Sequence, residues 1–227
     1  MKRIGLGAVL GCALLLFPLS SMARTDFQSW NNFTLMGPIN GNVRYWFDGQ
    51  IRIGNDASRL SQSIARPGIG YQLNKESSLW AGYAWIYTAR PFTPIVVHEH
   101  RTWQQFLWVK DIAPFKVFSR TRLEQRFIEN VPRTGWRVRQ FFRAQLPISE
   151  QHSFFVSAID EVFVRINNSR PFGNDRGFDQ NRLFLGVGFL PAKHWLAELG
   201  YQNQYIRRVG ISNFRGNYVM LTVIGNY

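Results

Sequence analysis

The chain has 227 residues and a formal charge of +13, from 27 Lys and Arg against 14 Asp and Glu. Cys12 is its single cysteine, which excludes a disulfide framework and a cysteine-based metal site. The positive charge alone suggests a nucleic-acid partner, but the export signal at the N-terminus argues against nucleic acid.

The first 23 residues have the features of a cleaved signal peptide. Lys2 and Arg3 give a positive start, residues 4–17 form an apolar run, and small residues lead up to Ala23. The run is shorter than the about 20 residues that a transmembrane anchor needs. We therefore expect cleavage after Ala23, which removes Cys12 and leaves residues 24–227 as one domain with its charge reduced from +13 to +11.

Beyond the signal peptide, apolar and polar residues alternate with a period of two. Side chains alternate across a strand, so each such segment has one apolar and one polar face. The polar faces carry dense Arg with Glu and Gln, which favours the charged lumen of a barrel over a soluble β-sandwich, the alternative. The pattern is clearest in residues 43–53, 117–127, 136–146, 182–189 and 197–205.

The links between these segments are short and long in turn. Outer-membrane barrels join their strands by short periplasmic turns and longer extracellular loops. The pattern predicts a single antiparallel transmembrane β-barrel of about ten strands, with both termini periplasmic, twelve strands as the alternative, and Phe27 to Met36 as a plug or partial strand. The short links are residues 73–76, 111–114, 147–150 and 191–193; the longer ones are 55–59, 90–97, 129–135, 167–177 and 207–216.

The last predicted strand runs from Asn217 to Tyr227 and ends on an aromatic residue. It resembles the C-terminal signal by which the barrel-assembly machinery recognises outer-membrane proteins, and this assigns Tyr227 as an assembly signal. We expect an integral outer-membrane protein of a Gram-negative bacterium, exported by the general secretory route. Its expected partners are outer-membrane lipid and lipopolysaccharide, and its expected state is a monomer.

Four stretches carry a resemblance to a known family. They are residues 66–71, 99–105, 122–126 and 179–182. They resemble a family of small Gram-negative outer-membrane β-barrel proteins of unknown function, and the resemblance covers most of residues 24–227. It implies a barrel in the outer membrane and implies no activity.

Charged residues gather on the predicted inner faces of the strands. In one interpretation they fill a small barrel as mutually satisfied ion pairs. In the other they line a basic lumen that passes or binds small anionic solutes, because Arg pairs with carboxylate and phosphate groups. No cofactor or metal is expected. The predicted lumen cluster consists of Arg101, Arg120, Arg122, Glu124, Arg126, Arg137, Arg139, Arg143, Glu161, Arg165, Arg182 and Glu198.

A porin-like or structural protein is therefore the first functional prediction, and two alternatives stay open. One is a lipid-modifying or hydrolytic outer-membrane enzyme, for which His98 and His100 lie near a predicted extracellular strand end. Two histidines are too few for a zinc site, and no serine stands out as a nucleophile, so we assign no catalytic residue. The other is a surface adhesin or ligand-binding barrel acting through residues 167–177 and 207–216.

Overall fold

A computed structural model of the chain describes residues 27–54, 57–149, 153–169, 176–210 and 212–227. The predicted signal peptide and Cys12 lie outside the described residues. No helix in the described ranges is long and apolar enough to cross a membrane. The strands are β1 (Phe27–Asn40), β2 (Val43–Gly54), β3 (Arg59–Gln72), β4 (Ser77–Thr88), β5 (Val97–Ile112), β6 (Phe115–Ile128), β7 (Gly135–Pro147), β8 (Phe154–Arg165), β9 (Gly177–Ala192), β10 (Trp195–Ile206) and β11 (Phe214–Asn226).

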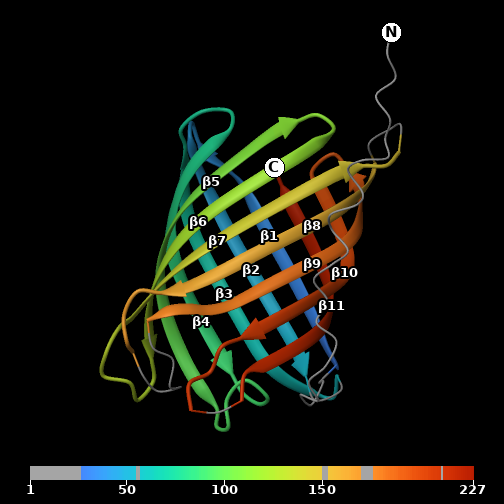
Figure 1. Cartoon of the computed structure of the whole chain (residues 1–227). Coiled ribbons are helices and arrows are strands. Elements are labelled where there is room, and N and C mark those ends of the chain that lie inside the picture. The colour runs from blue at the N-terminus through green and yellow to red at the C-terminus, as the bar shows by residue number, and fades with distance from the viewer. Residues whose placement is uncertain (1–26, 55–56, 150–152, 170–175, 211) are drawn as a thin grey trace.

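The eleven strands form one closed barrel in which each strand pairs with its neighbours in the sequence (Figure 1). Every consecutive pair is antiparallel, and β1 closes the sheet against β11. Closure gives each strand a partner on both sides, so the sheet presents no open edge for pairing with other chains. The predicted all-β fold, a single barrel with an Arg/Glu-rich lumen, is confirmed.

The number of strands differs from the ten or twelve that the sequence predicted. The segment from Phe27 to Met36, predicted as a plug or partial strand, belongs to a complete strand, β1. It runs antiparallel to β2 and parallel to β11, with Phe27 opposite Asn217. The prediction of an even number was wrong because an odd number of strands closes a barrel when the first and last run parallel. Parallel pairing is only slightly less stable per residue than antiparallel pairing.

The connections make the two ends of the barrel different. At one end, called here the short-turn end, the connections are residues 41–42, 73–76, 113–114, 148–153 and 193–194. At the other, the long-loop end, they are residues 55–58, 89–96, 129–134, 166–176 and 207–213. β11 finishes at the short-turn end, which is uppermost in Figure 1. β1 starts at the long-loop end, because it runs parallel to β11. The first strand therefore begins at the end opposite to the one where the last strand finishes, and the prediction that places both at the periplasmic end is wrong.

Side chains alternate between the lumen and the outer surface as predicted. In β7, Arg137 and Arg139 are buried inside, while Trp136 and Phe142 are exposed on the outside. The barrel therefore reverses the arrangement of a soluble protein, with its charges enclosed and its large apolar side chains exposed. Those exposed apolar side chains include Phe47, Ile51, Ile69, Leu79, Phe142, Leu183, Leu185, Val187, Leu199, Val219 and Leu221.

The outer face also carries polar side chains near the middle of several strands, and these pair across neighbouring strands. Gln104 and Gln125 exchange two amide hydrogen bonds, at 3.2 and 2.9 Å. Thr121 donates to Gln140 at 2.6 Å. Asn181 donates to Asp160 at 2.5 Å. These side chains therefore satisfy one another on the outside of the barrel.

Candidate functional site in the barrel lumen

The lumen contains a cavity of about 1510 Å³ that opens at the short-turn end. Asn42, Asn74 and Lys193 line its mouth on the turns, and its walls are formed by residues of β1 to β11 that face inward. Its volume exceeds the about 300–1,000 Å³ typical of small-molecule sites.

The cavity has a positive lining. Ten cationic side chains face it against five carboxylates, Asp48, Glu76, Asp111, Glu161 and Glu198. Five of the cations lie together at its inner end, and we call this group the arginine floor. A lining with twice as many cations as carboxylates attracts anions. The arginine floor consists of Arg52, Arg66, Arg120, Arg139 and Arg182.

The arginine floor is incompletely neutralised. Glu161 accepts from Arg120 and Arg139, each at 2.7 Å, and lies 3.5 Å from Arg182. Arg66 pairs with Asp48 at 2.6 Å. Arg52 instead donates to the amide oxygens of two neighbouring glutamines, Gln50 and Gln62, and has no ion-pair partner in the described part of the chain.

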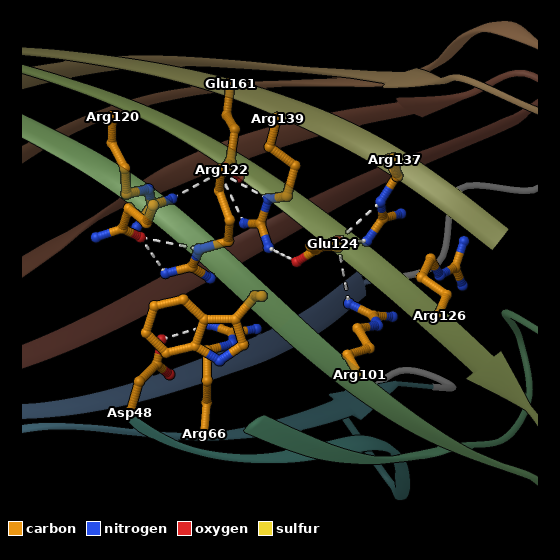
Figure 2. Close-up of polar contacts among 12 residues, drawn as sticks. Asp48, Arg66, Arg101, Arg120, Arg122, Glu124, Arg126, Arg137, Arg139 and Glu161 are labelled. Carbon is orange, nitrogen blue, oxygen red and sulfur yellow. Dashed lines mark hydrogen bonds and ion pairs between the residues drawn. The ribbon is translucent and has the colours of Figure 1, made fainter. Parts of the chain in front are cut away.

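Beyond the floor, a continuous network of ion pairs crosses the lumen, with Glu124 at its centre. This carboxylate is 1 % exposed and receives Arg137 at 2.6 Å and Arg139 at 2.8 Å. Figure 2 shows Arg101 approaching the same carboxylate from the other side, at 3.7 Å. Three guanidinium groups thus converge on one buried charge.

The network continues toward the long-loop end through two further carboxylates. Glu99 accepts paired hydrogen bonds from both Arg101 and Arg126. Asp179 binds Arg165 at 2.9 Å and Arg137 at 3.1 Å. The last contact joins β7 to β9 and passes over β8, so the network ties together strands that do not pair in the sheet. Glu99, Arg101 and Arg165 are on the part of the network that does not line the cavity.

Aromatic rings support the guanidinium groups. Arg52 lies 3.7 Å above the centroid of Trp30, and Arg182 lies 5.1 Å from the same ring. Arg122 lies 4.7 Å above Trp103 and donates twice to Gln105, with no ion pair in the described ranges. Cation–π contacts of this kind are worth more when both groups are desolvated, so they offset part of the cost of burying these charges.

The structure places all twelve residues of the predicted lumen cluster inside the barrel. One pair, Arg143 of β7 with Glu198 of β10 at 3.0 Å, crosses the lumen between distant strands. The prediction omitted five residues that belong to the same sites. Asp48 and Arg52 lie on the polar face predicted for residues 43–53, and Glu99 lies two residues before Arg101 on the same face of its strand, so the alternation could have found all three. The other two omitted residues are Arg66 and Asp179.

The period-two pattern of the sequence is less clear around Arg66 and Asp179. Arg66 is followed by Pro67 and Gly68, which obscure the strand pattern. Asp179 and Arg182 both face inward, although residues three apart in a regular strand point to opposite faces. The pairing of β8 with β9 shifts register between Phe163 and Val164, and this irregularity breaks the period of two.

The histidines of the enzyme alternative lie on the outer face. His98 stacks on Trp85 with ring centroids 5.8 Å apart, and His100 is hydrogen-bonded to the hydroxyl of Tyr83. Both are half-exposed or exposed and belong to an aromatic group close to the long-loop end. In the described ranges, no three His, Cys, Asp or Glu side chains are grouped so that they could hold a metal ion.

Comparison with known proteins extends over nearly the whole barrel. Residues 27–215 match the family described as "Protein of unknown function (DUF2490)". The chain is also similar to an uncharacterized protein of Methylorubrum extorquens, with 36 % identity over 185 residues, covering 80 % of this chain and 79 % of the relative. The matched region begins with β1, and it includes both the arginine floor and the ion-pair network.

Proposed function

We propose that this chain, which belongs to the DUF2490 family of proteins of unknown function, is an integral outer-membrane β-barrel that binds small anionic solutes in its lumen. The observation that carries the proposal is the cavity of about 1510 Å³, which ends on five arginines and two carboxylates. Binding is favoured over passage because the network around Glu124 fills the lumen beyond this floor.

Several features support the membrane location. Strands of 12 to 16 residues exceed the about 9–11 that a tilted strand needs to span a bilayer. Closure of the sheet satisfies the backbone groups internally, as lipid requires. The outer face exposes large apolar residues, and its polar side chains, such as Gln104 and Gln125, bond to each other rather than requiring water. The predicted signal peptide and the terminal Tyr227 support export and barrel assembly.

By the usual asymmetry of such barrels, the short-turn end faces the periplasm and the long-loop end faces outward. The cavity then opens to the periplasm and receives its solute there. Arginines are also frequent at the long-loop end, and guanidinium groups pair well with phosphates. We expect this rim to contact the phosphates of lipopolysaccharide. The rim arginines are Arg59, Arg90, Arg133, Arg176, Arg207 and Arg215.

The location is tested by fractionation and by gel mobility. The protein should sediment with outer membranes, and an unboiled sample in detergent should migrate differently from a boiled one because the closed barrel resists unfolding. Recovery in the soluble periplasmic fraction would refute the membrane location.

Solute binding is tested on purified protein in a non-ionic detergent by calorimetric titration. Inorganic phosphate should bind, whereas choline, a small cation, should not. In planar bilayers the same protein should show no steady conductance, because the ion-pair network closes the lumen. A steady anion-selective current would show that the barrel passes anions rather than binding them. Equal heats for phosphate and choline would refute the proposed anion site.

A further inference from the structure

We infer that the cavity takes amphipathic organic anions, with a phosphate or carboxylate head on the arginine floor and an apolar body against the walls above it. This inference rests on the anion binding proposed above and adds the class of ligand. It is argued from the buried donors of the cavity lining, from the residues that form its walls, and from the charge of the floor.

Four side chains of the cavity lining carry buried hydrogen-bond donors without partners in the described part of the chain. The Nε atoms of Arg52, Arg66 and Arg120 and the indole nitrogen of Trp46 are buried and have no hydrogen-bond partner among the described residues. Arg52, Arg66 and Trp46 are only 4 %, 2 % and 7 % exposed. Buried polar groups in proteins are nearly always hydrogen-bonded, so the side chains that line this part of the cavity are short of acceptors.

Most of the unsatisfied atoms along the lining are of one kind. Seven such atoms belong to residues of the lining. Six are N–H donors, namely the four above and the amide nitrogens of Gln145 and Gln202, and the seventh is the acceptor Oδ1 of Asn32. An oxyanion offers only acceptors, several to each group, and guanidinium groups present their N–H bonds in a fork that matches it. A phosphate or carboxylate therefore fits this set better than a neutral polar solute does.

The charge of the floor also favours an anionic ligand. Four of the five arginines pair with Asp48 or Glu161, and Arg139 also reaches Glu124. The fifth, Arg52, pairs with neither. Figure 2 shows Arg66 and Arg120 directed toward the same interior region as Arg122, which has no carboxylate of its own. Buried cations without counter-charges cost several kcal/mol each. An anion bound on the floor reduces that repulsion.

The walls above the floor are apolar and explain why the ligand needs an apolar body. Between the floor and the mouth, aromatic and aliphatic side chains lie beside polar ones, among them Gln145, Thr222 and the Arg143–Glu198 pair. Trp46 and Trp80 pack edge to face with centroids 5.4 Å apart on one side of the cavity. A fully hydrated inorganic ion would leave this surface wetted, whereas an apolar group would bury it at a gain of about 25 cal/mol per Å². These walls include Met36, Trp46, Trp80, Leu107, Phe118, Phe141, Phe155, Ile159 and Met220.

The experiment is a calorimetric titration of the full-length barrel in a non-ionic detergent with three probes. They are 1-naphthyl phosphate, inorganic phosphate and 1-naphthol, which separate the contributions of the head group and the apolar body. We expect 1-naphthyl phosphate to bind at least tenfold more tightly than inorganic phosphate and at least tenfold more tightly than 1-naphthol.

Two variants locate the site. Arg52→Gln removes a floor charge that has no carboxylate partner, so no acidic group is left unpaired. Arg44→Gln is the matched control, since Arg44 lines the same cavity near its mouth and bonds Asn226 and the carbonyl of Tyr227. Arg52→Gln should weaken 1-naphthyl phosphate at least tenfold, and Arg44→Gln less than threefold. If Arg52→Gln fails to fold, as judged by gel mobility, Trp46→Phe replaces it and should weaken the same probe severalfold.

Each other outcome is decisive. If inorganic phosphate binds as tightly as 1-naphthyl phosphate, the barrel binds anions but the inference of an amphipathic ligand is overturned. If 1-naphthol binds as tightly as its phosphate, the arginine floor does not hold a head group. If Arg44→Gln weakens binding more than Arg52→Gln, the site lies at the mouth. If neither anion binds, the proposed function fails together with the inference.

Discussion

Replacing Glu124 by Gln removes one carboxylate charge from the centre of the lumen while keeping the size of the side chain. Glu124 is 1 % exposed and accepts from Arg137 at 2.6 Å and from Arg139 at 2.8 Å. The variant therefore leaves three buried guanidinium groups facing a neutral amide, and one of them, that of Arg101, keeps both oxygens of Glu99. Because Gln fits the same space, the change tests the charge of the network separately from its packing.

The expected loss follows from what each arginine retains. Removing one partner of a buried ion pair costs about 3–5 kcal/mol, mainly because the other charge stays buried. Arg137 keeps Asp179 at 3.1 Å and Arg139 keeps Glu161 at 2.7 Å, so neither is left without a carboxylate. We therefore expect the lower end of that range, a fall of about 3 kcal/mol in the free energy of unfolding.

The assay is urea unfolding in a non-ionic detergent, followed by the emission of the buried tryptophans Trp30, Trp80 and Trp103. The matched control is Glu76→Gln, which breaks the exposed pair with Lys110 at 3.2 Å. That pair lies in water, so its loss should cost less than about 1 kcal/mol. If Glu124→Gln unfolds within about 0.5 kcal/mol of the wild type, the network does not stabilise the barrel and the reasoning from burial is wrong.

Two further predictions concern packing and assembly. Gly82→Ala should lower the free energy of unfolding by about 1–3 kcal/mol, because the added Cβ would overlap the Pro67 carbonyl and lie 2.7 Å from Gly68 Cα. Gly49→Ala, whose Cβ would meet only the Phe47 ring at 3.5 Å, should change it little, and equal losses in urea unfolding would contradict this. Tyr227→Ala should reduce the protein in the outer-membrane fraction severalfold, measured by immunoblot, while protein refolded in detergent keeps its urea midpoint. An unchanged amount in the membrane would remove Tyr227 as an assembly signal.

Much of the fold could be predicted because a barrel is encoded locally. Within one strand, the alternation of Arg137 and Arg139 with Trp136 and Val138 already decides which face is inside. Most of the connections could be predicted for the same reason, since each interrupts the alternation between two strands; the turn at residues 41–42, which follows β1, was missed. These features depend on residues close together in the sequence, where side-chain period and turn chemistry act.

The strand count could not be obtained in that way because β1 lacks the local signal. Its residues include Asn31, Asn32, Gly37 and Pro38, and its apolar and polar residues do not alternate regularly. What makes it a strand is pairing with β11, about 190 residues away, in a parallel register. Long-range pairing of this kind supplies hydrogen bonds on both sides of a segment whose own composition favours turns.

The same limit applies to the site. Which arginines would face inward followed from the alternation, but which carboxylate each would meet did not. Arg143 reaches Glu198 across the lumen, and Arg137 reaches Asp179 past an intervening strand. Such partners are set by the tilt and stagger of strands in a closed barrel, and the sequence pattern of single strands does not contain that information. The cavity is likewise a property of the closed sheet.

The distribution of unsatisfied groups argues that the arginines do more than fill the barrel. Apolar side chains fill an interior at lower cost than buried ion pairs do, and replacing such pairs by hydrophobic residues is often neutral or stabilising. If the arginines served only as filling, their N–H groups should be equally well satisfied throughout the lumen. Instead, Glu99 and Glu124 hold well-satisfied arginines on the long-loop side, whereas Arg52, Arg66 and Arg120 keep unpaired Nε–H groups where the cavity begins. This distribution favours the proposal that the ion-pair network supports the floor and that an anion binds at the floor.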